Sequence, residues 1–201
     1  MKASRKQLRL KHYDYTESGV YFVTVCSRNR ECLFGDIVGA TGRSPALQLN
    51  AYGNIVRDEW LKSAVIRNEI TLDAFVVMPN HIHGIIFIIR ATGRSPLHDT
   101  MKPGLRSRSL GAFMAGFKSS TTKQINIIRA TPGIPVWQRN YYEHVIRTDD
   151  ELNKTREYII NNPMQWELDE ENPLNVSGVL QNASAGFRHA YGSESNLRAI
   201  A

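Results

Sequence analysis

The amino-acid sequence predicts an α+β protein built from an antiparallel sheet and several helices. Short runs of β-branched and aromatic residues, such as 21–26 and 143–147, are typical of strands. Segments with apolar residues three or four positions apart, such as 51–67 and 110–117, are typical of amphipathic helices. At 201 residues, with 42% hydrophobic and 22% charged residues, the chain has the length and composition of one globular domain.

The clearest local prediction is an antiparallel hairpin that turns at residues 79–80. Residues 71–77 form its first strand, and 81–89 form its second, an apolar run opened by two histidines. Because side chains alternate along a strand, His81 and His83 project from the same face. Two such imidazoles suit a divalent metal ion, although the same spacing also fits polar residues at a strand edge that are satisfied by backbone or water.

A third helix is predicted in the last third of the chain. Thr148 and Glu151 have the spacing of a capping box, with Thr148 as N-cap. Pro163 is expected to end the helix. Tyr158 and Asn162 are four residues apart, so they share a helix face near that end. Each residue alone is most often a half-buried aromatic or a helix-terminal amide.

The charge of the chain favours a polyanionic partner, nucleic acid before a membrane surface. The net charge is +6 and the pI is near 9.4. Residues 1–12 and 101–130 carry basic but no acidic side chains. A disordered terminus and a core helix with a solvated face are the alternatives for these two segments. The candidate nucleic-acid-binding residues, expected to contact phosphates, are Arg5, Lys6, Arg9, Lys11, Arg106, Arg108, Lys118 and Lys123.

We interpret the chain as a basic arm over 1–12, a single domain over 13–171 and a loosely ordered tail over 172–201. The hexapeptide Ala-Thr-Gly-Arg-Ser-Pro occurs unchanged at 40–45 and 91–96. The two copies share no repeating context, so they predict insertions in surface loops rather than a repeat architecture.

The cysteine content and the hydropathy pattern favour a cytoplasmic protein without a membrane partner. Cys26 and Cys32 are too few for a zinc module or a disulfide framework, and a reduced protein is expected. No signal peptide is recognised, and the apolar run at 82–89 is too short to span a bilayer.

Together, these motifs resemble those of single-tyrosine HUH transposases, and most closely the REP-associated tyrosine transposases. The resemblance covers roughly residues 8–166. It rests on Tyr-Phe-Val-Thr at 21–24, Met-Pro-Asn-His-Ile-His at 78–83, the segment 137–147, and Arg-Glu-Tyr-Ile-Ile-Asn-Asn-Pro at 156–163. It implies the HUH endonuclease fold, a ferredoxin-like or RRM-like antiparallel sheet with helices packed on one face.

The resemblance also implies a chemistry for the site. His81 and His83 would bind Mg²⁺ or Mn²⁺, and Asn162 would supply the third protein ligand. Tyr158 would attack the scissile phosphate of single-stranded DNA, giving a 5′-phosphotyrosine and a free 3′-hydroxyl. The substrate would be a hairpin with a short flanking sequence. Relatives include monomers and homodimers that exchange the tyrosine helix.

Two other functions remain open at this point. One is a non-catalytic nucleic-acid-binding module of ferredoxin-like fold, in which the histidines have no catalytic role. The other is a metal-dependent phosphodiesterase that uses water as nucleophile. Neither requires Tyr158 and Asn162 four residues apart, and this pairing favours a transposase-like enzyme that nicks and rejoins DNA.

Overall fold

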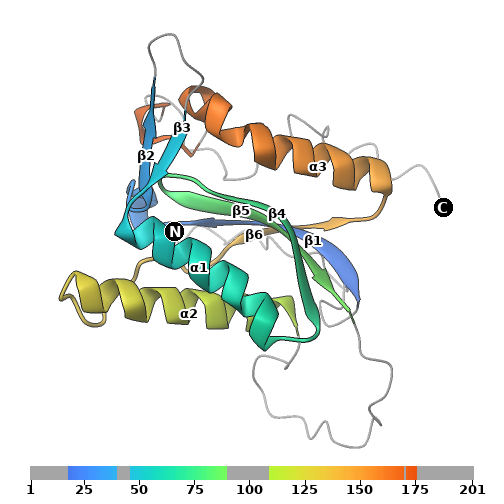
Figure 1. Cartoon of the computed structure of the whole chain (residues 1–201), viewed down its shortest axis with the longest axis horizontal. Helices are drawn as coiled ribbons and strands as arrows, with labels where there is room; N and C mark the ends of the chain where they lie inside the picture. Colours follow the sequence, from blue (N-terminus) through green and yellow to red (C-terminus); the bar gives the residue numbers. More distant parts are fainter. Residues whose placement is uncertain (1–17, 40–45, 90–108, 170, 176–201) are drawn as a thin grey trace, which may run out of the picture.

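The computed structural model describes residues 18–39, 46–89, 109–169 and 171–175 (Figure 1). A four-stranded antiparallel sheet forms its centre, in the order β4-β5-β1-β6. The main elements follow the chain order β-α-β-β-α-β and then a third helix: β1 (Gly19–Cys26), α1 (Ala51–Ile66), β4 (Ile70–Val77), β5 (His81–Ile88), α2 (Leu110–Ile128), β6 (Tyr142–Ile146) and α3 (Asp149–Asn161). This order and pairing are ferredoxin-like, so the predicted fold class is confirmed.

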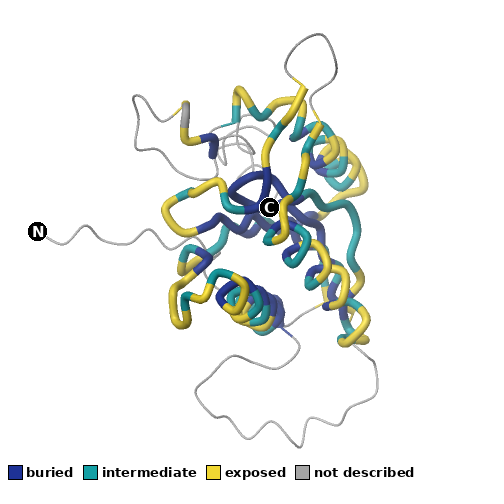
Figure 2. Tube along the Cα trace, turned by 60° about the vertical axis from the view of Figure 1, so that its left-hand side comes forward, coloured by how far each residue is buried: buried dark blue, intermediate teal, exposed yellow. Residues whose placement is uncertain are grey.

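The helices form two layers around the sheet (Figure 1). α1 and α2 share one face, as the resemblance predicts for the helices, whereas α3 covers the opposite face. β1 shows why both faces need a cover: Tyr21 and Val23 belong to the larger core, and Phe22 between them belongs to a second core with Ile159 of α3. A central strand with apolar side chains on both faces must be covered on both. Figure 2 shows the buried strands at the centre and exposed residues on the outer sides of the helices.

A close contact between helix α1 and strand β5 fixes the strand that carries the histidines. Trp60 is fully buried and lies against Gly84, the residue after His83. A Cβ atom at Gly84 would lie 2.3 Å from Cζ2 of the Trp60 indole. Only glycine therefore lets α1 pack this closely on β5.

The sequence did not predict one small element, the two-stranded sheet of β2 (Gly35–Val38) and β3 (Ala46–Leu49). The strands are four residues long and only partly buried, so they lack the apolar runs that identify the central strands. The first hexapeptide copy, 40–45, connects these paired strands, and both copies lie outside the described residues.

Within the described residues there are three short 3₁₀ helices: η1 (Arg28–Arg30), η3 (Asn162–Leu168) and η4 (Pro173–Asn175). The α-helical geometry of α3 ends at Asn161, close to the predicted stop at Pro163, and the chain continues directly as η3. Asn162 keeps helical backbone angles, φ −56° and ψ −41°, although it precedes proline. No helix within the described ranges is long and apolar enough to cross a membrane.

Candidate metal and tyrosine site

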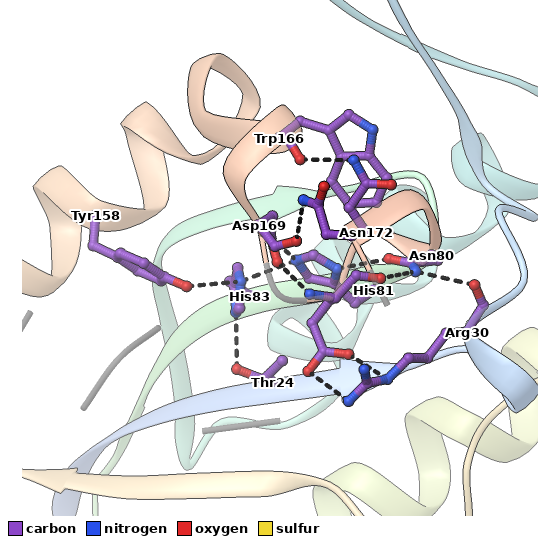
Figure 3. A network of polar contacts seen from close by, with 11 residues as sticks. Thr24, Arg30, Asn80, His81, His83, Tyr158, Trp166, Asp169 and Asn172 are labelled. Carbon is purple, nitrogen blue, oxygen red and sulfur yellow. Dashed lines mark hydrogen bonds and ion pairs between the residues drawn. The ribbon is translucent and has the colours of Figure 1, made fainter. Parts of the chain in front are cut away.

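The two histidines of β5 converge on the face of the sheet that α3 covers (Figure 3). His81 and His83 are both buried, and their Nε2 atoms lie 3.0 Å apart. The pairing of β5 with β1 places His83 opposite Thr24 and His81 opposite Cys26. The predicted placement on one face is thus present, at the buried centre of the sheet.

Hydrogen bonds on the far side of each ring orient the imidazoles. Nδ1 of His81 lies 2.8 Å from Oδ1 of Asn80, and Nδ1 of His83 lies 2.8 Å from the Thr24 hydroxyl. The Asn80 amide nitrogen donates to the carbonyls of Arg30 and Glu171, so its oxygen faces His81. His81 Nδ1–H therefore donates to this oxygen, which leaves a lone pair on Nε2. Metal-binding histidines are typically held in this way.

Burial keeps both imidazoles neutral. Desolvation and, to a lesser extent, the nearby positive charge of Arg30 lower the pKa of His81 to about 3, while the Asn162 amide opposes this shift. Desolvation, together with the neighbouring His81, also lowers the pKa of His83 well below its usual value. A neutral imidazole is the form that binds a metal ion, so no proton competes for these sites near neutral pH.

Helix α3 places the predicted tyrosine beside the histidines. The Tyr158 hydroxyl lies 3.4 Å from Nε2 of His83, and its ring makes edge contacts with His83 and Phe22. Figure 3 shows this side chain extending from the helix toward His83. The structure thus brings Tyr158, which the resemblance indicated as a site residue, together with the two histidines.

Asn162 lies at the end of the same helix and is 3% exposed. Its amide oxygen is buried and accepts no hydrogen bond from the described residues. The amide lies beside His81, whose pKa it raises. A buried oxygen without a partner costs free energy unless something binds it, and a metal ion would satisfy it.

The structure adds one acidic residue that the sequence did not indicate. Asp169 follows η3, and its Oδ2 lies 3.9 Å from Nε2 of His81. One ligand atom from each of Asp169, His81 and His83 can be chosen so that all lie within 4.8 Å of one another. No spacing pattern connects Asp169 to the histidines, because it reaches them only through the turn of η3.

This donor set fits a divalent cation. Two imidazole nitrogens and a carboxylate oxygen lie within 4.8 Å of one another, and the buried amide oxygen of Asn162 has no hydrogen-bond partner among the described residues. Oxygen and imidazole ligands suit ions such as Mg²⁺ and Mn²⁺. His81, His83 and Asp169 therefore form a group that can hold a metal ion.

One ion pair and one histidine–carboxylate hydrogen bond fasten α3 to the sheet. Arg156 contacts Asp73 of β4 with Nη2 at 2.5 Å and Nε at 3.1 Å from Oδ2. At the start of the helix, Nε2 of His144 lies 2.5 Å from the Glu151 carboxylate. Thr148 caps α3 as predicted, but the Glu151 side chain accepts from the backbone N–H of Arg147 rather than that of Thr148.

The candidate DNA-binding residues are only partly described. Lys118 is half-buried and donates to the carbonyls of Gln138, Arg139 and Asn140, so its ammonium group holds this segment onto α2. Desolvation lowers the pKa of Lys118 to about 8. Lys123 is exposed on the same helix. The remaining candidates lie outside the described residues: Arg5, Lys6, Arg9, Lys11, Arg106 and Arg108.

The predicted tail begins inside the described structure. Asn172, its first residue, is 4% exposed, and its amide donates to the Trp166 carbonyl at 2.9 Å. Residues 176–201 lie outside the described part of the chain.

Comparison with known proteins gives a relative and a structural neighbour. A Haemophilus influenzae protein, described as uncharacterized, is 40% identical over 172 residues, which are 83% of this chain and 92% of that protein. No family model matches the chain. The solved structure of a REP-associated tyrosine transposase bound to a REP hairpin matches with a TM-score of 0.50 and 20% identity, over 78% of this chain and 73% of that one. The chain belongs to the same family as the Haemophilus influenzae protein, and it has the fold of a REP-associated tyrosine transposase.

Proposed function

We propose that this protein is a metal-dependent transposase that nicks and rejoins single-stranded DNA through Tyr158. The observation that carries the proposal is the 3.4 Å approach of the Tyr158 hydroxyl to Nε2 of His83, at the point where His81 and His83 converge. A nucleophilic hydroxyl beside a candidate metal group is an arrangement suited to covalent phosphoryl transfer.

His81, His83 and Asn162 would hold Mg²⁺ or Mn²⁺. When bound, the ion would polarise the scissile phosphate and offset the negative charge that develops during transfer. Asn80 and Thr24 keep the two imidazoles in their orientation, and the surrounding apolar residues exclude water from the buried side. This pre-set arrangement reduces the reorganisation needed at the moment of reaction.

Tyr158 would act as the nucleophile. Its phenol oxygen forms a bond to phosphorus while the bond from phosphorus to the 3′ oxygen breaks. The products are a 5′-phosphotyrosine and a free 3′-hydroxyl, and the phenol proton is balanced by the proton gained by the leaving oxygen. The phosphodiester energy is retained in the tyrosine ester, so the reverse attack by a 3′-hydroxyl rejoins DNA without ATP.

The substrate would be single-stranded DNA folded as a hairpin. The basic chain favours such a polyanion, and the structural neighbour is described as bound to a REP hairpin. A groove of about 910 Å³ lies between α2 and residues 130–139, and the exposed residues Lys123 and Arg139 are part of its lining. None of the described residues that line this groove is acidic, which suits a phosphate backbone.

A covalent-trapping gel tests the proposal. Labelled hairpin DNA from around the gene is incubated with the protein and Mn²⁺ or EDTA, then run under denaturing conditions. We expect a shifted protein–DNA band that requires metal and is lost in Tyr158→Phe. Tyr52→Phe is the matched control, because Tyr52 lies on α1, on the opposite face of the sheet.

The alternatives give different results in the same experiment. Cleavage that persists in Tyr158→Phe without a covalent band would show a phosphodiesterase that uses water. DNA binding that survives EDTA, with no cleavage of several hairpins, would show a non-catalytic nucleic-acid-binding module.

A further inference from the structure

We propose that Asp169 is an anionic ligand of the metal ion and that a clamp formed by Glu171, Arg30 and Asn80 holds it over the histidines. This inference rests on the metal site of the proposed function and extends it beyond α3. The sequence indicated the segment after η3 only as the end of the domain. Under this proposal, that segment contributes a ligand to the metal site.

The two oxygens of Asp169 have different surroundings. Oδ1 accepts the backbone N–H of Glu171 at 2.7 Å, which fixes the carboxylate in a tight turn. Oδ2 is directed toward the histidines, 3.9 Å from Nε2 of His81. A distance of this size is too long for a hydrogen bond, but it suits two ligands of a common ion. Figure 3 shows Asp169 beside the two imidazole rings.

Glu171 anchors this turn to the opposite side of the site. Its carboxylate pairs with Arg30, with 2.8 Å between Nε and Oε2 and 3.4 Å between Nη2 and Oε1. The Glu171 side chain is 5% exposed and that of Arg30 is 26% exposed, so the carboxylate is the member of the pair that is largely screened from water. Losing one partner of such a pair leaves a buried charge uncompensated, and the turn should stay in place only while both are present.

One amide connects the clamp with the first histidine. The Asn80 side chain donates to the Glu171 carbonyl at 2.6 Å, while its oxygen lies 2.8 Å from Nδ1 of His81. The same side chain therefore orients a ligand on β5 and the turn that carries Asp169. This single side chain therefore links Asn80 on β5's turn to Glu171, which is 91 positions further along the chain.

The charge of the site explains why an acidic ligand matters. Two neutral imidazoles and an amide oxygen carry no net charge, and such a set binds Mg²⁺ or Mn²⁺ weakly. A carboxylate adds one negative charge and a hard oxygen donor. Arg30 forms its ion pair with Glu171, so the carboxylate of Asp169 remains available to the metal ion. Affinity in the absence of DNA should therefore depend strongly on Asp169.

The test is a Mn²⁺ titration of the DNA-free full-length protein, followed by electron paramagnetic resonance and calorimetry. We expect Asp169→Asn to weaken Mn²⁺ binding at least about tenfold. The matched control is Glu167→Gln, which removes the same charge from an exposed position two residues away. Its affinity should stay within about twofold of the wild type, since distant surface charges are screened. Equal thermal unfolding of both variants would show that they are folded.

A second variant tests the clamp separately. Arg30→Ala leaves every proposed ligand in the chain but removes the partner of Glu171, so Mn²⁺ affinity should fall between that of the wild type and that of Asp169→Asn. Wild-type affinity in Asp169→Asn, or no Mn²⁺ binding by the wild type, would overturn the proposal.

The same variants separate this inference from the proposed function. Tyr158→Phe should bind Mn²⁺ normally while losing the covalent product. If Asp169→Asn loses Mn²⁺ binding but the wild type forms no covalent product, the ligand assignment stands and the transposase function fails. If covalent cleavage proceeds and Asp169→Asn binds Mn²⁺ normally, the transposase function stands and the ligand assignment fails.

Discussion

Arg156 on α3 and Asp73 on β4 form a two-pronged ion pair on the flank of the tyrosine helix opposite Tyr158. The buried stripe of α3 includes Thr155 and Ile159. At 100° per residue, Arg156 lies to one side of this stripe and Tyr158 to the other. Asp73 lies at a register shift in the pairing of β4, where its Oδ1 also accepts the N–H of Ala74. The ion pair is therefore placed to restrain rotation of the helix about its axis.

We expect Asp73→Asn to lower the rate of DNA cleavage without preventing DNA binding. The phenol oxygen stands roughly 8 Å from the helix axis, so a rotation of about 15° would move it by roughly 2 Å. Displacements of this size at a reacting atom cost on the order of 100-fold in rate. Single-turnover cleavage and DNA affinity, measured separately, check this prediction.

Asp58→Asn is the matched control, since Asp58 pairs with Arg57 on the exposed surface of α1. It should leave both quantities unchanged. Arg156→Lys keeps the positive charge but cannot make the two-pronged contact. Its cleavage rate should fall between those of the wild type and Asp73→Asn. A uniform loss of DNA binding and cleavage in Asp73→Asn would indicate general misfolding and contradict a positioning role.

Acid should destabilise the metal-free protein through the buried histidines. The folded pKa of His81 is about 3, below the ordinary value of 6.5. Between these values the unfolded state binds more protons, so stability is present above pH 6.5 and falls as the pH drops toward 3. At pH 5 the loss from His81 alone would be about 2 kcal/mol.

Urea denaturation in EDTA at pH 7 and pH 5 measures this loss. The double variant His81→Gln/His83→Gln should show a smaller difference between the two pH values. His144→Gln, which alters a half-exposed histidine, should retain most of it. An unchanged pH dependence in the double variant would assign the effect to other groups.

Thr24→Val should weaken metal binding without changing the shape of the site. Valine matches threonine in size but cannot accept from Nδ1–H of His83, which lies 2.8 Å from the hydroxyl. The loss of such a second-sphere hydrogen bond typically costs about 10- to 100-fold in metal affinity. Mn²⁺ titration checks the effect, with Thr71→Val on the exposed surface of β4 as control. Equal affinities for the two variants would argue against the orienting role of Thr24.

Gly84→Ala should destabilise the fold by about 1–3 kcal/mol, because the new methyl group would overlap the Trp60 indole. Gly116→Ala is a stringent control on α2, where the new methyl group would meet only the flexible end of Arg67, 2.9 Å away. That variant should be neutral or slightly stabilising, because alanine favours a helix. Thermal unfolding of both proteins would decide, and equal destabilisation would show that the close packing of α1 on β5 is not the cause.

Local patterns in the sequence were sufficient for much of this site. The period of two along β5 placed His81 and His83 on one face, and Thr148 marked the start of α3. The resemblance to a known family then joined Tyr158 and Asn162 to the histidines. The predictions of strand alternation and helix capping succeeded because both depend on residues only a few positions apart.

Tertiary packing alone decided the rest. It placed α3 on the face opposite α1 and α2, paired Arg156 with Asp73 across 83 positions, and brought Asp169 to the histidines. Each of these contacts joins segments far apart in the chain, and its formation depends on the whole sheet being covered on both faces. The sequence by itself determined which chemical groups lie on one strand and on one helix. The packing of those elements decided which groups meet, because the free energy of burial depends on which apolar surfaces come together and not on short sequence motifs.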